Sequence, residues 1–167
     1  MSGQATPVKT NTGVERLSAL VSYLPLAGFL IDFAIRLAVG VDDWKQAGLD
    51  AAVLWLIGIG GIILGLPHLV RPAPVAARIG WPTSPFQWEV GLGAVGFAVL
   101  GVTASVFDRD YTLAAIIVYS IFMLGAALGH VRSMIRDRNF APGNAGYIFW
   151  YDILAPALLI TLYVATG

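Results

Sequence analysis

Twenty residues without a formal charge occupy positions 51–70, with the sequence AAVLWLIGIGGIILGLPHLV. About 20 apolar residues are what an α-helix needs to cross the hydrocarbon core of a bilayer. Residues 90–107 and 111–131 are uncharged in the same way, and Asp152 is the only charged residue from position 139 to the C-terminus. The sequence therefore predicts four transmembrane helices in this part of the chain.

A further apolar segment precedes these, at residues 17–41, and it differs because it carries Pro25, Asp32 and Arg36. Asp32 and Arg36 are four residues apart, so they share a helix face and can form an ion pair, or else contact a neighbouring subunit. We interpret the segment as a fifth span with polar outer turns. The alternative is a helix that lies in the membrane interface.

The predicted fold is an all-α integral membrane bundle with a four-helix core and an additional N-terminal helix. We place the five transmembrane helices at about residues 17–40, 50–70, 85–107, 110–131 and 144–165. They form a single domain, residues 17–167, after a polar tail at residues 1–16. The tail and the first apolar run show no small-residue cleavage site, which favours a retained span over a removed signal peptide.

Composition agrees with this class and excludes several others. The 167 residues are 57% hydrophobic and only 12% charged, about half the charged fraction of soluble domains. The formal net charge is zero, so no basic surface for nucleic acid is predicted. The absence of cysteine rules out disulfides, thiol catalysis and zinc–thiolate sites.

The distribution of basic residues predicts the orientation in the membrane. If there are five spans, the N-terminal tail and two loops fall on one side, and that side holds seven of the ten Lys and Arg residues. The positive-inside rule then places the N-terminus in the cytoplasm and the C-terminus outside. We expect the protein in a bacterial cytoplasmic (inner) membrane.

Glycines spaced for close helix packing occur in three of the predicted spans. In lipid, helices associate through small residues that let their backbones approach. Close packing inside the bundle is the simpler interpretation, and a homodimer seam is the alternative. The residues are Gly61 and Gly65, Gly93 and Gly96, and Gly125 and Gly129.

Four ionisable residues lie within the predicted spans, where each is a functional hypothesis because charge is costly in lipid. His68, Glu89, His130 and Asp152 fall at similar depths in the cytoplasmic half. Spacing with the glycines turns His68 and Glu89 into the bundle. Such a set can bind a divalent metal, relay protons or hold a polar ligand, ligate a haem, or form a hydrogen-bonded cluster that fixes helix register.

One polar residue near this set has a second interpretation. Gln87 follows Ser84 and Pro85 with the spacing of a capping box, in which it would complete the N-terminus of the third span. We also include it among the candidate polar residues beside Glu89. The sequence leaves both roles open.

Several short strings resemble a family of small bacterial multi-pass membrane proteins of unknown function. They are Gly80-Trp81, SPFQWEVG at residues 84–91, Gly129-His130, PGNAG at residues 142–146, Asp152 and Pro156. More distantly the arrangement resembles the four-helix DoxX-like proteins. The resemblance covers about residues 68–156, which leaves the first segment as an addition. It implies no activity, but it implies that Glu89, His130, Asn144 and Asp152 belong to one motif set.

Small size and the near absence of extramembrane parts lead us to expect a non-catalytic accessory or scaffold subunit of a larger membrane complex. Its partners would be lipids and other membrane subunits, or further copies of the chain. The alternative is a small protein that handles ions, protons or small molecules through the polar cluster. No nucleophile elbow, HExxH or CxxC motif is present, so an enzyme is less favoured. The sequence requires no cofactor, although a divalent metal would suit the cluster.

Overall fold

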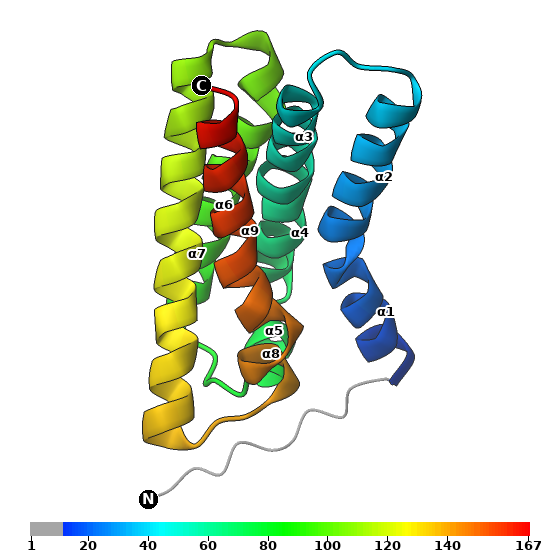
Figure 1. Cartoon of the computed structure of the whole chain (residues 1–167). Helices are drawn as coiled ribbons and strands as arrows, with labels where there is room; N and C mark the ends of the chain where they lie inside the picture. Colours follow the sequence, from blue (N-terminus) through cyan, green and yellow to red (C-terminus); the bar gives the residue numbers. More distant parts are fainter. Residues whose placement is uncertain (1–11) are drawn as a thin grey trace, which may run out of the picture.

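A computed structural model describes residues 12–167 and is entirely helical over that range (Figure 1). The predicted cytoplasmic tail lies mostly outside the described residues, since these begin at position 12. Four helical stretches are long and apolar enough to cross a membrane: Trp44–Val70, Phe86–Val106, Arg109–Asp137 and Pro142–Ala165. The chain is therefore a multi-pass helical membrane protein, as its composition predicted.

The first two helices stand beside this bundle. Helix α1 (Thr12–Ser22) and helix α2 (Leu24–Ala38) follow one another with Pro25 in the first turn of α2. They run along α3 and α4 from one end of the bundle to the other (Figure 1). Gly28 on α2 makes this contact close, because a side chain there would collide with the ring of Trp55.

The first candidate span has three parts, α3 (Trp44–Ala52), a π-helical segment η1 (Val53–Ile59) and α4 (Gly60–Val70). Asp43 caps its start, because its side chain accepts hydrogen bonds from the backbone N–H groups of Lys45 and Gln46 at 2.9 and 3.1 Å. The helix therefore begins earlier than the predicted residue 50. Pro72 then starts the short helix α5 (Pro72–Ile79) in the connection, which ends at Gly80 with φ +80°.

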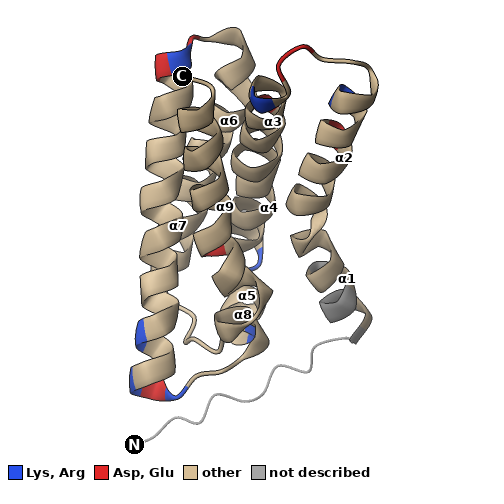
Figure 2. Cartoon of the chain, viewed as in Figure 1, with Lys and Arg blue, Asp and Glu red and all other residues tan. Residues whose placement is uncertain are grey.

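The remaining helices are α6 (Phe86–Thr103) with a short 3₁₀ turn η2 (Ala104–Val106), α7 (Arg109–Asp137), α8 (Pro142–Ala145) and α9 (Tyr147–Ala165). Asp108 caps α7 by accepting from the N–H of Tyr111 at 2.9 Å. Helix α7 continues six residues past the predicted end, to Asp137. Most of the charged residues lie toward the two ends of the bundle (Figure 2).

A seam of small residues joins the first span to α6. It contains Gly58, Gly61 and Gly65 on one side and Gly91, Ala94, Ala98 and Gly101 on the other. A methyl group at Gly61 would lie 2.6 Å from the ring of Phe97, and one at Gly65 would lie 2.9 Å from the carbonyl oxygen of Gly91. The predicted packing role of Gly61 and Gly65 inside the bundle is confirmed.

The other predicted packing glycines behave differently. Gly93 and Gly129 are packed less closely, since a Cβ atom there would lie 3.3 Å from Phe122 and 3.6 Å from Trp81 respectively. At Gly96 and Gly125 a Cβ atom would have no neighbour within 4 Å, so their expected role in packing within the chain is wrong. The reason is the register of α6, whose inward face runs through Gly91, Ala94, Ala98 and Gly101 instead of Gly93 and Gly96.

Candidate functional site

His130 is a buried polar residue near the end of the apolar part of α7. Its side chain is 5% exposed, and its Nδ1 lies 2.8 Å from Oδ1 of Asn144. Asn144 belongs to the short helix α8, which Pro142 begins and which turns the chain back from α7 into α9. Asn144 is completely buried, so this loop residue belongs to the interior of the bundle.

The hydrogen bonds of Asn144 fix which ring nitrogen of His130 carries a proton. Its Nδ2 donates to two backbone carbonyls, of Asn139 at 2.9 Å and of His130 at 3.3 Å. The amide is therefore oriented with its oxygen toward the ring, and an amide oxygen only accepts. His130 must donate from Nδ1, which leaves Nε2 as the nitrogen that can gain or lose a proton.

Asp152 on α9 faces that nitrogen. The distance from His130 Nε2 to Asp152 Oδ2 is 3.5 Å, and Asp152 is 3% exposed. Its Oδ2 is buried without a hydrogen-bond partner among the described residues. The pair is thus in electrostatic contact while its geometry falls short of a hydrogen bond, an arrangement that is costly inside a membrane unless a proton is shared.

Three tyrosines extend this site toward the middle of the bundle. Tyr119 of α7 lies close enough to interact electrostatically with Tyr147, Tyr151 and Asp152. The hydroxyl group of Tyr147 is buried without a hydrogen-bond partner in the described chain. Tyr119 and Tyr151 interact through their hydroxyl groups, and Tyr151 also donates to the carbonyl of Leu56 at 3.4 Å. Tyr119 and Tyr151 therefore lie beside the carboxylate of Asp152. The Oδ2 atom of that carboxylate is itself buried without a partner in the described chain, which is rare in proteins.

A second layer closes the other side of His130. The indole of Trp81 lies 5.4 Å from the imidazole, centroid to centroid, and its Nε1 donates to Ser133 Oγ at 3.1 Å. Asn139 donates to the same hydroxyl at 3.2 Å and to the carbonyl of Ile79 at 2.9 Å. These bonds hold the loop after α5 against the end of α7, next to His130.

His68 belongs to a separate pair. Its Nδ1 lies 3.0 Å from Oε1 of Gln87, and both side chains are buried. Gln87 therefore does not cap α6, and its predicted capping role is wrong. The cause is the same helix register as in the glycine seam, because Gln87 stands four residues before Gly91 and so faces α4.

Glu89 is exposed and forms no hydrogen bond or ion pair with the other described residues, so its expected inward direction is wrong. Each residue turns a helix by about 100°, which puts Glu89 about 200° away from the inward-facing Gln87. The four ionisable residues therefore do not form one cluster. Among the described residues no group of three His, Cys, Asp or Glu side chains is arranged to hold a metal ion.

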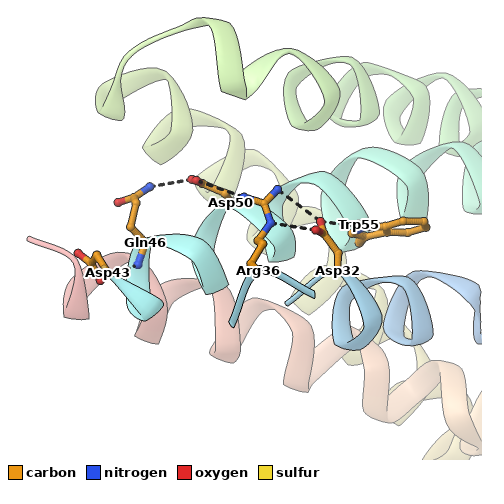
Figure 3. A network of polar contacts seen from close by, with 6 residues as sticks. All are labelled: Asp32, Arg36, Asp43, Gln46, Asp50 and Trp55. Atoms are coloured by element: carbon orange, nitrogen blue, oxygen red, sulfur yellow. Dashed lines mark hydrogen bonds and ion pairs between the residues drawn. The ribbon is translucent and has the colours of Figure 1, made fainter. Parts of the chain in front are cut away.

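The predicted ion pair of Asp32 and Arg36 is present at the opposite end of the bundle and belongs to a larger network (Figure 3). Arg36 Nε lies 2.9 Å from Asp32 Oδ1, and Trp55 Nε1 donates to Asp32 Oδ2 at 3.2 Å. Arg36 Nη1 also lies 3.9 Å from Asp50, which accepts from the Gln46 side chain at 2.7 Å. The network joins α2 to α3 and η1.

Sequence reasoning found His130, Asn144 and Asp152 but missed the residues around them. Tyr147, Tyr151 and Trp81 lie near span ends, where aromatic residues are typical of the membrane interface. Ser133, Asn139 and Tyr119 carry no pattern that separates them from other helix residues. The string Gly80-Trp81 in the family resemblance was the one signal that pointed to this layer.

Comparison with known proteins gives the chain a family. Residues 16–167 match a family of unknown function, DUF6790, and the chain belongs to it. The match begins at residue 16, so the first helical segment is part of the family and is not an addition outside it. No curated protein and no solved structure matches the chain.

Proposed function

We propose that this chain is a proton-handling membrane protein in which His130 and Asp152 together hold one exchangeable proton. The observation that carries the proposal is the fixed tautomer of His130. Because Asn144 holds Nδ1 as a donor, Nε2 and Asp152 Oδ2 face each other with 3.5 Å between them. One proton makes the pair either carboxylic acid and imidazole or carboxylate and imidazolium, and a small approach of the two side chains would join them in a hydrogen bond.

The arrangement is suited to proton exchange rather than to covalent catalysis. The two forms of the pair differ only in the position of one proton, so little rearrangement accompanies the transfer. Loss of that proton would leave a buried carboxylate against a lone pair, which burial disfavours. The hydroxyl groups of Tyr119 and Tyr151 interact electrostatically with Asp152, and we propose them as the route by which the proton leaves.

The placement in the membrane supports this role. We propose five spans, with α1 and α2 forming the first, since the two helices run the full height of the bundle (Figure 1). Arg78, Arg132, Arg136 and Arg138 then lie at the cytoplasmic end, and the C-terminus lies outside. The His130–Asp152 pair would face the cytoplasmic side of a bacterial inner membrane, behind Trp81 and Asn139.

The expected accessory role stays a prediction and is compatible with a proton site. A small subunit that contributes a proton-binding pair to a larger transport or electron-transfer complex would need little extramembrane structure. Gentle extraction followed by native mass spectrometry checks this role. Larger subunits that copurify in fixed ratio would support it, and a lone monomer or homo-oligomer would contradict it.

Infrared difference spectroscopy of the reconstituted protein tests the proton site directly. We expect a pH-induced carbonyl-stretch band of a buried carboxylic acid that disappears in Asp152→Asn and shifts in His130→Gln. His68→Gln is the matched control, because it removes the other buried histidine, and it should leave the band unchanged. A band that survives in Asp152→Asn, or a wild-type spectrum with neither this band nor the ring bands of a protonated His130, would refute the proposal.

A further inference from the structure

A cavity of about 330 Å³ opens at the end of the bundle opposite the His130–Asp152 pair. Its walls come from α3, η1, the end of α6 and the start of α7. The volume is within the range of small-molecule sites, which begin at about 300 Å³. Its lining includes the apolar residues Leu49, Val53 and Val102 and charged residues of both signs: Arg36, Asp50, Asp108 and Arg109.

Arg109 leaves a positive charge beside the cavity without a negative partner. Its Nη1 donates to the hydroxyl of Thr166 at 2.8 Å and its Nη2 to the carbonyl of Tyr163 at 2.6 Å. The guanidinium also lies 3.9 Å from the centroid of the Tyr163 ring. All of these partners are neutral, and no carboxylate among the described residues forms an ion pair with Arg109. A ligand anion would supply the missing charge.

Asp50 also lines the cavity and carries the opposite charge. One of its oxygens accepts from Gln46, and the other lies 3.9 Å from Arg36, too far for a hydrogen bond (Figure 3). Arg36 makes its close contact with Asp32 instead, at 2.9 Å. Two carboxylates therefore share one guanidinium, which leaves a net negative charge at this wall. A ligand ammonium group would complete it.

We propose that this cavity binds a small zwitterion, with its ammonium group at Asp50 and its anionic group at Arg109. The apolar residues of the lining accommodate the carbon atoms between or beside the two charges. Ethanolamine phosphate has this chemistry, and so does the same group as the head of a phospholipid whose chains extend along the outside of α6. The site lies apart from the His130–Asp152 pair and is independent of the proton-handling proposal.

Thermal unfolding of the full chain tests the site with two probes. Free phosphoethanolamine is titrated against protein in nanodiscs of phosphatidylglycerol, and separate nanodiscs contain phosphatidylethanolamine. We expect a saturable rise in melting temperature from at least one probe. A rise from the soluble compound identifies a free zwitterion, and a rise only in the phosphatidylethanolamine discs identifies the lipid headgroup.

Two variants and two controls locate the effect. Asp50→Asn keeps the acceptor for Gln46 and removes only the charge, and Arg109→Gln removes the cation. Each should weaken the ligand response at least tenfold, measured against that variant's own ligand-free melting temperature. Asp42→Asn and Lys45→Gln change charges at the same end outside the cavity and should respond as wild type does. No response to either probe, or an unchanged response in both variants, would overturn the site.

Discussion

His130 Nε2 and Asp152 Oδ2 lie 3.5 Å apart, on two helices that pack along each other, while the second nitrogen of the same ring is held by Asn144 at 2.8 Å. Asn144 therefore hydrogen-bonds one nitrogen of the ring, whereas Asp152 lies beside the other nitrogen without hydrogen-bonding to it. A well-packed interior would normally close such a gap. The loose contact includes the two atoms between which a proton would move, so stability and proton binding should respond differently to substitution.

Asp152→Asn should keep or raise the stability of the protein while it abolishes proton exchange. The new amide can donate from Nδ2 to His130 Nε2, which Asn144 has left as an acceptor. It also removes a buried ionisable group, and we expect a gain of up to about 1 kcal/mol from the hydrogen bond. Unfolding in detergent, followed by circular dichroism, checks the sign.

Asp137→Asn is the matched control for that experiment. Asp137 is exposed and its ion pair with Arg136, at 3.4 Å, is at the surface, where such pairs contribute little. The Asp137→Asn variant should therefore be as stable as wild type. A marked fall in the stability of Asp152→Asn would mean that the aspartate is paired in the membrane and that its unpartnered oxygen carries no cost.

Asn144→Ala should lower the stability of the bundle more than the substitution of an exposed residue does. The change removes three hydrogen bonds and leaves the carbonyl of Asn139 and His130 Nδ1 without their partner, while the carbonyl of His130 keeps its acceptor role within α7. Each unsatisfied buried group costs about 1–3 kcal/mol, partly relieved by relaxation. Gln46→Ala, which loses one exposed hydrogen bond, should stay within about 0.5 kcal/mol of wild type. Equal effects of the two changes would show that Asn144 is not a structural centre of the site.

The glycine seam predicts a contrast between substitutions of the same type. Gly61→Ala and Gly58→Ala would place methyl groups 2.6 Å from Phe97 and 2.9 Å from Val102, and overpacking of this kind costs about 1–3 kcal/mol. Gly96→Ala and Gly125→Ala add a methyl group to open space and should be neutral or slightly stabilising, because alanine favours the helix. Destabilisation by the second pair would indicate that this face packs against another chain.

The spans were predictable because lipid imposes a strong and simple constraint on composition. Uncharged runs marked all four candidate helices, and the spacing of Gly61, Gly65 and His68 correctly gave the inward face of α4. Register within α6 was not predictable in the same way. Its sequence contains small residues on several faces, and the true seam through Gly91, Ala94, Ala98 and Gly101 depends on the partner helix.

The candidate site was predictable only in its ionisable members. His130 and Asp152 stand out because charge is rare in a span, but their contact depends on how α8 turns the chain between α7 and α9. The neighbouring Tyr119 and Trp81 are ordinary aromatic residues by sequence. Their part in the site follows from burial and from hydrogen bonds to residues far along the chain, which no local pattern encodes.

The proposed five-span topology makes a prediction about the two ends of the first helical segment. The chain has no cysteine, so single cysteines at Ser2 and Asp42 can be labelled selectively with a membrane-impermeant maleimide. If α1 and α2 cross the membrane, Asp42→Cys should react in intact cells and Ser2→Cys only after permeabilisation. A cysteine at Ala73, in the connection after α4, should behave as the one at Ser2 does. Reaction of Ser2→Cys and Asp42→Cys on the same side would place the first segment along the membrane surface and leave four spans, with the orientation of the remaining helices still reported by Asp42 and Ala73.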